Sequence, residues 1–223
     1  MIFFSCLIAS LIGYFLGSCN SSIIVVKLLK GKDIREYGSN NAGLTNTLRC
    51  FGKGCALLTL IGDLTKGVVA VLLSRLICSL MNAGINGGDI HYIGYIAGFF
   101  AILGHIFPIY YGFRGGKGVL VGVSIFIVTD PPVFLILILI FIFILVISKY
   151  VSLSSIISAG LAPFITFVFH GLIYDEPLKY ALLYSILSLL MSSVIIYMHK
   201  SNIERLKNGV ENKFSFNSSN TKK

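Results

Sequence analysis

An all-helical, polytopic membrane protein of about seven transmembrane helices is the fold class that this sequence predicts. Two observations carry that prediction: the apolar composition, and the recurrence of uncharged stretches long enough to cross a bilayer. Of the 223 residues, 56% are hydrophobic and only 12% are charged, whereas about 25% of the residues in soluble domains are charged. This composition excludes an ordinary soluble enzyme, a nucleic-acid-binding domain and a disordered chain.

A spanning helix needs about 20 mostly apolar residues, and the chain holds seven such stretches. They are residues 2–29, 54–80, 90–110, 115–130, 132–148, 152–173 and 177–198. Proline cannot continue a helix, so Pro131 and Pro132 separate the fourth stretch from the fifth. We expect residues 1–212 to form one seven-span domain and residues 213–223 to be a disordered basic tail.

The net charge of +9 is distributed unevenly between alternate loops. Fifteen of the 18 Lys and Arg residues lie in the segments 27–53, 105–117 and 149–151 and in the tail from residue 199. The intervening loops are acidic and lie at 81–90, 129–132 and 174–179. Because basic loops stay in the cytoplasm, we expect the N-terminus outside, the C-terminus in the cytoplasm and any active site on the cytoplasmic face.

The first basic segment, residues 33–49, is rich in short hydrogen-bond donors. Its candidate ligands are Ser39, Asn41, Thr45, Asn46 and Arg49. Gly and Asn tolerate positive φ, which lets successive backbone N–H groups converge on an anion, and a planar guanidinium suits phosphate. The pattern favours a phosphate-binding loop, and the alternative is a solvated connector built from turn residues.

The second basic segment joins His105 to a glycine-rich run, Gly115, Gly116, Lys117 and Gly118. Glycines on both sides of a lysine allow backbone N–H groups and the ammonium to reach one phosphate together. The run is not a Walker A loop, because Gly118 stands where Ser or Thr should follow the lysine. The alternative interpretation is a flexible basic turn at the membrane face.

Further polar residues stand out at the end of the last apolar stretch and inside the second. His199 and Asn202 are three residues apart and would share one face of a helix, either as site residues or as part of an amphipathic anchor.

Asp63 and Lys66 carry charge at membrane depth, where charge is costly. They predict either an i,i+3 structural pair or a ligand-binding group.

The three basic segments together resemble those of the bacterial membrane glycerol-3-phosphate acyltransferases that use acyl phosphate as donor. The similarity covers about residues 10–212. It rests on the runs Asp-Ile-Arg…Gly-Ser…Thr-Asn…Arg, Gly-His…Phe-Pro…Gly-Gly-Lys-Gly and His…Asn-Ile…Arg-Leu…Gly…Glu, in that order. The resemblance implies transfer of an acyl group to the 1-hydroxyl of glycerol 3-phosphate, giving lysophosphatidic acid and phosphate, at the cytoplasmic face of a bacterial inner membrane.

The resemblance also implies roles for individual residues. Ser39, His199 and Asn202 would be catalytic, and either His199 or a phosphate oxygen of the substrate would be the base. The residues that would bind substrate are Asn41, Thr45, Asn46, Arg49, His105, Gly115, Gly116, Lys117 and Gly118. We expect the protein to need no metal and no cofactor. We expect its partners to be acyl phosphate, glycerol 3-phosphate and membrane lipid, and we expect no nucleic acid among them.

Two other functions are compatible with parts of the sequence. His170 and Asp175 have the His-x4-Asp spacing of other acyltransferases, although the charge asymmetry puts them on the outer face. A transporter or channel for a small anion would also use charges at membrane depth.

Overall fold

The computed structural model describes residues 2–81 and 91–214, and every regular element in those two ranges is helical. The chain divides into two compact units, Met1–Pro131 and Pro132–Lys223. An all-helical fold follows from the bilayer, because a backbone in lipid must satisfy its own hydrogen bonds.

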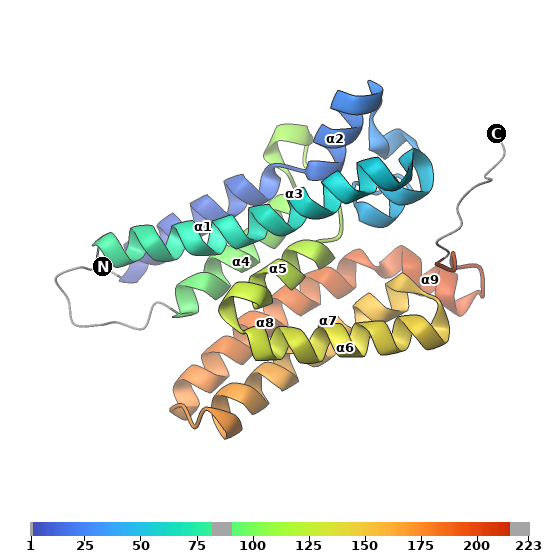
Figure 1. The fold of residues 1–223 in the computed structure, drawn as a ribbon. Coiled ribbons are helices and arrows are strands. Elements are labelled where there is room, and N and C mark those ends of the chain that lie inside the picture. Colours follow the sequence, from blue (N-terminus) through green and yellow to red (C-terminus); the bar gives the residue numbers. More distant parts are fainter. Residues whose placement is uncertain (1, 82–90, 215–223) are drawn as a thin grey trace. The chain divides into compact units, whose positions relative to one another are not determined.

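The first unit contains five α-helices and the two basic segments that precede Val119. The helices are α1 (Ile2–Ser18), α2 (Ser21–Lys30), α3 (Leu44–Met81), α4 (His91–Ile106) and α5 (Val119–Thr129), with short 3-10 turns η1 (Ile34–Glu36) and η2 (Ile109–Tyr111). Figure 1 shows α1 running beside α3, and α1 also packs against α4. A Cβ at Gly13 or Gly17 of α1 would collide with the backbone of α4, so these small residues permit the close approach of the two helices.

The expected span at residues 2–29 consists of two helices rather than one. Helix α1 ends at Ser18, and Asn20 caps α2 because its side-chain oxygen accepts a hydrogen bond from the Ile23 N–H (3.2 Å). Helix α3 also begins earlier than predicted, at Leu44. Residues 44–51 are therefore helical instead of being part of a loop, and the helix is interrupted at Gly52, whose φ is 81°.

The second unit contains the remaining helices. These are α6 (Pro131–Ser148, whose first residue is the last of the first unit), α7 (Val151–Val168), a π-helical turn η3 (Phe169–Ile173), α8 (Leu178–Met198) and α9 (Lys200–Lys207). Helix α7 packs against α8, and the short α9 contacts both. Val133 is the one fully buried residue of helix α6, whose mean hydropathy is 3.1 over its most apolar window, as expected of a helix whose surface faces lipid.

Six helical segments in the described residues are long and apolar enough to cross a membrane. Of the seven predicted stretches, 115–130 is the one that does not contain a helix of this length. Only the 11 residues of α5 are helical within it. At 1.5 Å per residue α5 is about 17 Å long, because the glycine-rich run before it is not helical. Seven crossings therefore stay a prediction, and the loop at 82–90 and the tail from 215 lie outside the described residues.

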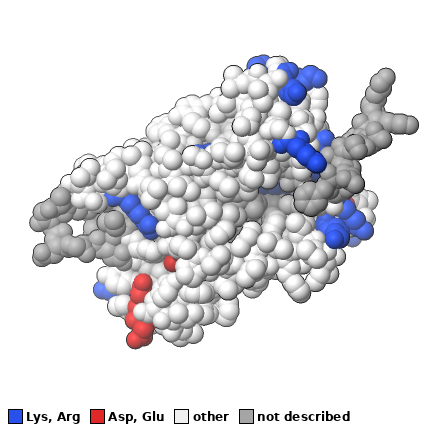
Figure 2. All heavy atoms as spheres, viewed as in Figure 1, with Lys and Arg blue, Asp and Glu red and all other residues white. Residues whose placement is uncertain are grey.

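Charged side chains gather at particular ends of each unit. In the first unit, Figure 2 shows Lys and Arg around the end at which α2 finishes, where Lys27 and Lys30 occupy its last turn. In the second unit, Arg205 and Lys207 lie in the last turn of α9, whereas the acidic group lies at the turn between α7 and α8. The segment that follows α2 leads directly into the candidate site.

Candidate active site

Asn46 organises the first candidate loop from within. Its buried amide donates to the carbonyl oxygens of Tyr37 (2.9 Å) and Asn41 (3.1 Å), and its Oδ1 accepts from the Ser39 N–H (3.0 Å). These three hydrogen bonds shape the loop. Ser39 is left exposed and Asn41 half-buried at the surface of the loop that Asn46 holds.

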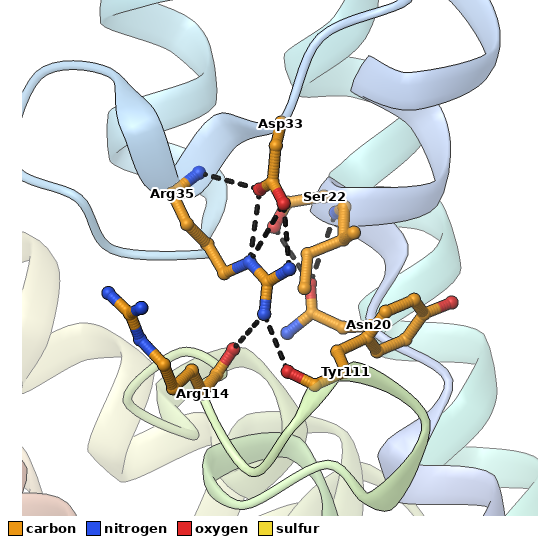
Figure 3. Close-up of polar contacts among 7 residues, drawn as sticks. Asn20, Ser22, Asp33, Arg35, Tyr111 and Arg114 are labelled. Carbon is orange, nitrogen blue, oxygen red and sulfur yellow. Dashed lines mark hydrogen bonds and ion pairs between the residues drawn. The ribbon is translucent and has the colours of Figure 1, made fainter.

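A charged clamp, Asp33 with Arg35, ties this loop to the segment before the glycine-rich run (Figure 3). The Arg35 guanidinium donates to the carbonyl oxygens of Tyr111 (2.6 Å) and Arg114 (3.3 Å), and its Nη2 pairs with Asp33 Oδ2 at 2.7 Å. Hydrogen bonding from Arg35 lowers the pKa of Asp33, and Asp33 in turn raises the pKa of Arg35. Charge-assisted contacts of this kind are about twice as strong as neutral ones, so the two loops form one structure.

The glycine-rich run lies against the first loop. The Gly116 N–H donates to the His105 carbonyl (3.1 Å), and the Ala42 N–H donates to the Gly115 carbonyl (3.4 Å). A Cβ at Gly116 would collide with His105 Nε2 and with the Ala42 carbonyl oxygen. Gly118 has φ 82° and caps α5, a conformation that side chains rarely adopt. Gly116 is therefore required because the two loops approach closely, and Gly118 is required because of its backbone conformation.

Positive charge and backbone donors surround these joined loops. Thr45 and Arg49 lie on the first turns of α3, half-buried, and Lys117 is half-buried in the glycine-rich run. The first N–H groups of a helix lack partners within that helix, which makes its N-terminus suitable for an anion. In the first unit the Ala42–Gly115 hydrogen bond therefore joins the loop of Ser39 and Asn41 to the glycine-rich run that contains Lys117, and Arg49 lies on the helix that follows the first loop.

His105 is buried beneath the glycine-rich run. Its Nδ1 lies 2.8 Å from Lys66 Nζ, and Lys66 forms an ion pair with Asp63 at 2.9 Å. The i,i+3 pair predicted from the sequence is confirmed. The contact between that pair and His105 was not predicted, because 39 residues separate Lys66 from His105.

In the second unit, His199 is buried at the junction of α8 and α9. Its Nδ1 lies 2.8 Å from the Ile195 carbonyl oxygen. A carbonyl oxygen only accepts hydrogen bonds, so Nδ1 carries a proton, and in a neutral ring the lone pair would be on Nε2. This tautomer allows Nε2 to accept a proton or a hydrogen bond.

Asn202, on α9, is also buried, and Glu211 holds its side chain. The Asn202 amide donates to Glu211 Oε1 (2.8 Å), which also accepts from Ser152 on α7 (3.0 Å), while Arg205 pairs with Oε2 at 2.6 Å. Burial raises the pKa of Glu211, but the hydrogen bonds from Asn202, Arg205 and Ser152 outweigh it, so the pKa lies below its ordinary value. Glu211 therefore stays ionised and fixes the turn that follows α9.

Comparison with known proteins identifies the family. A family model described as glycerol-3-phosphate acyltransferase matches residues 7–209. The chain is 38% identical to the glycerol-3-phosphate acyltransferase of Clostridioides difficile strain 630, over 94% of this chain and 96% of the relative, and 39% identical to that of Shouchella clausii strain KSM-K16, over 91% and 93%. The chain belongs to the glycerol-3-phosphate acyltransferase family.

Crystal structures of one member of this acyltransferase family agree with the fold. They are of PlsY (YgiH), an integral membrane glycerol 3-phosphate acyltransferase, in its glycerol 3-phosphate form and its lysophosphatidic acid form. The glycerol 3-phosphate form is 31% identical to this chain in sequence, with a TM-score of 0.76. The lysophosphatidic acid form is 29% identical, with a TM-score of 0.74. Each comparison covers 95% of this chain and 96% of PlsY.

Sequence reasoning did not include Arg35, Ser152 and Glu211 among the candidate site residues. Each of them contacts a candidate residue or its loop, and only the Arg and Glu of the family runs indicated Arg35 and Glu211. The His-x4-Asp alternative is not supported by the contacts of its histidine, because His170 Nδ1 lies 3.1 Å from Glu176, the residue after Asp175.

Proposed function

We propose that the protein transfers an acyl group from acyl phosphate to the 1-hydroxyl of glycerol 3-phosphate. The hydroxyl oxygen attacks the acyl carbon, the bond between that carbon and the phosphate oxygen breaks, and lysophosphatidic acid and inorganic phosphate are released. The hydroxyl proton passes to a base. Acyl phosphate is a mixed anhydride with a good leaving group, so the reaction needs no covalent enzyme intermediate.

The observation that supports the proposal is the contact, within the first unit, between the first candidate loop and the glycine-rich run, both of which have the composition of phosphate-binding loops. The Ala42–Gly115 hydrogen bond and the Arg35 clamp hold the loop of Ser39 and Asn41 against the glycine-rich run. Such a reaction requires that two phosphates be held and that a hydroxyl be aligned with a carbonyl. Preorganised N–H donors and cations supply both the binding and the stabilisation of the developing oxyanion.

The proposed roles follow from the chemistry of each group. Arg49, Lys117 and the glycine-rich backbone bind phosphate, and Ser39 positions substrate. Asn202 positions substrate through its amide, and its Glu211 contact fixes the direction of that amide. His199 donates from Nδ1 to the Ile195 carbonyl, so in its neutral form Nε2 would accept the hydroxyl proton, or would orient the hydroxyl while a substrate phosphate oxygen accepts that proton.

We also propose that the site faces the cytoplasm of a bacterial inner membrane. The exposed Lys27 and Lys30 adjoin the first loop, and basic segments remain on the cytoplasmic side. Glycerol 3-phosphate, which is soluble and anionic, would then reach the loops from water, while the acyl chain stays in lipid.

The donor is tested by offering purified protein in detergent acyl phosphate, acyl-CoA and acyl carrier protein thioester separately, each with glycerol 3-phosphate. We expect lysophosphatidic acid from acyl phosphate alone. Product formed at equal rate from a thioester would contradict the proposed donor.

The phosphate ligands are tested by Arg49→Ala and Lys117→Ala, with Lys53→Ala as the matched control because Lys53 is exposed beyond the break at Gly52. Losing a charge-assisted hydrogen bond costs about 1.5–3 kcal/mol, or about ten- to hundred-fold in activity. We expect that loss in both variants and not in the control. Near-normal turnover in either variant would remove that residue from the site.

A further inference from the structure

A buried charged cluster lies beneath the glycine-rich run, where α3 passes the end of α1 and the end of α4. It comprises Asp63, Lys66 and His105, whose exposed fractions are 1%, 7% and 3%. Lys66 Nζ lies 2.9 Å from Asp63 Oδ1, 3.1 Å from the Cys19 carbonyl oxygen and 2.8 Å from His105 Nδ1. The Lys66 ammonium thus has three neighbours from three different parts of the first unit.

The hydrogen bond from Lys66 decides which ring nitrogen of His105 carries the proton. An ammonium has three N–H donors and no acceptor, and its partners are a carboxylate oxygen, a carbonyl oxygen and an imidazole nitrogen. The Lys66 ammonium forms an ion pair with Asp63 and can only donate to its two other neighbours, the Cys19 carbonyl oxygen and His105 Nδ1. His105 Nδ1 therefore carries a lone pair, and the neutral ring carries its proton on Nε2.

The His105 ring lies at the place where the two loops meet. A Cβ on Gly116 would collide with both His105 Nε2 and the Ala42 carbonyl oxygen, and the His105 backbone carbonyl accepts the Gly116 N–H at 3.1 Å. His105 thus contacts the glycine-rich run through its ring and through its backbone. A different ring orientation would move Nε2 away from Gly116.

We propose that Asp63 and Lys66 are positioning residues that hold His105 in its neutral Nε2–H tautomer, and that His105 in turn fixes the glycine-rich run against the first loop. This proposal rests on the proposed function only in taking those loops as the phosphate-binding site. A buried ion pair contributes little net stability, and apolar residues of similar volume often replace one without loss. Placing a buried ion pair against one imidazole therefore indicates a role in orientation.

The tautomer is measured by nitrogen NMR of the full chain in detergent micelles, labelled with 15N-histidine. The chain has four histidines, and the His105 signals are those that disappear in His105→Gln. We expect wild-type His105 to show a protonated Nε2 and an unprotonated Nδ1. An imidazolium or a protonated Nδ1 in the wild type would overturn the proposal.

Two variants test whether the ion pair sets that tautomer. In Lys66→Met the buried Asp63 carboxylate, 3.8 Å from His105 Nδ1, becomes the nearest acceptor, so we expect the proton to move to Nδ1. The double variant Asp63→Asn with Lys66→Met keeps the volume and leaves no unpaired charge, and it remains testable if the single variant does not fold. Unchanged His105 signals in the folded double variant would overturn the proposal.

Kinetics separate positioning from simple structural support. A catalytic group misplaced by about 1 Å can lose about a hundred-fold in rate, so we expect the folded double variant to lose at least about ten-fold in kcat/KM, with KM for glycerol 3-phosphate raised. His105→Gln, whose amide N–H reaches the Nε2 position, should retain more activity than His105→Asn.

Thr59→Val is the matched control. Thr59 is buried on the same helix and donates only to the Cys55 carbonyl in the described contacts of the chain. We expect both wild-type kinetics and wild-type His105 signals in this variant. Wild-type KM and kcat in the folded double variant would overturn the positioning role, whereas failure of wild-type protein to use acyl phosphate would contradict only the proposed donor.

Discussion

Replacing Gly116 with alanine tests whether the contact between the two loops controls activity. The added Cβ would collide with the Ala42 carbonyl oxygen and with His105 Nε2. Carbon and oxygen atoms in contact are ordinarily about 3.3–3.6 Å apart, so the glycine-rich run must move by about 1 Å from the first loop. The neighbour on one side is backbone and on the other a buried ring, so neither can rotate away.

Such a displacement has a calculable effect. Overpacking costs about 1–3 kcal/mol of stability, and a shift of about 1 Å at a reacting centre costs about a hundred-fold in rate. We expect Gly116→Ala to remain folded at 25 °C, with a lower melting temperature and kcat/KM reduced about a hundred-fold in the acyl transfer assay.

The matched control is Gly54→Ala on α3. No atom lies within 4 Å of a Cβ built there, and alanine in a helix is favoured over glycine by about 0.5–1 kcal/mol. We expect this variant to be as active as the wild type and slightly more stable. If Gly116→Ala retained full activity beside this control, the close contact of the loops would have no part in catalysis.

Three further predictions concern the clamp, the Glu211 contacts and the topology. Arg35→Ala removes the ion pair with Asp33 and the hydrogen bonds to two carbonyls, so thermal unfolding in detergent should show a loss of about 1.5–3 kcal/mol. Glu211 has a pKa lowered in the folded protein from 4.5, so its contribution to stability is present above pH 4.5 and is lost as the pH falls through the folded pKa. The melting temperature of Glu211→Gln should therefore lie below that of the wild type at pH 7, and the difference should disappear in acid. In intact cells and a background without the native cysteines, a thiol reagent outside should label Asp175→Cys and not Asn212→Cys, and the reverse pattern would contradict the predicted cytoplasmic face.

Hydropathy predicted the class of this fold because lipid selects helices, but it could not locate polar helices or broken ones. Residues 44–51 contain Thr45, Asn46 and Arg49, whose polarity is the same whether the backbone is helical or extended, so their place on α3 was missed. The stretch 115–130 was counted as a span because its average is apolar, although the run ending at Gly118 holds its first residues out of a helix.

The candidate site was predictable as a set of residue types and not as a set of contacts. Ser39, Arg49 and Lys117 stand out because phosphate chemistry requires such groups. Asn46 is predicted to bind substrate, and no local pattern indicates the contacts by which its side chain also shapes the loop. The partners of Arg35 lie 76 and 79 residues away, a separation that no local pattern encodes.

The break at Gly52 divides α3 into a short polar part, residues 44–51, and a long apolar part that is suited to crossing the bilayer. From Gly52 to Met81 the helix is about 45 Å long, which exceeds the roughly 30 Å of bilayer hydrocarbon, and a helix that is too long for its bilayer tilts. Because the chain bends at Gly52, a change of tilt in that part need not be passed on to residues 44–51, which carry Arg49. The segment that we propose binds phosphate can therefore keep its position when the bilayer thickness changes, as it does when the lipids of the membrane change.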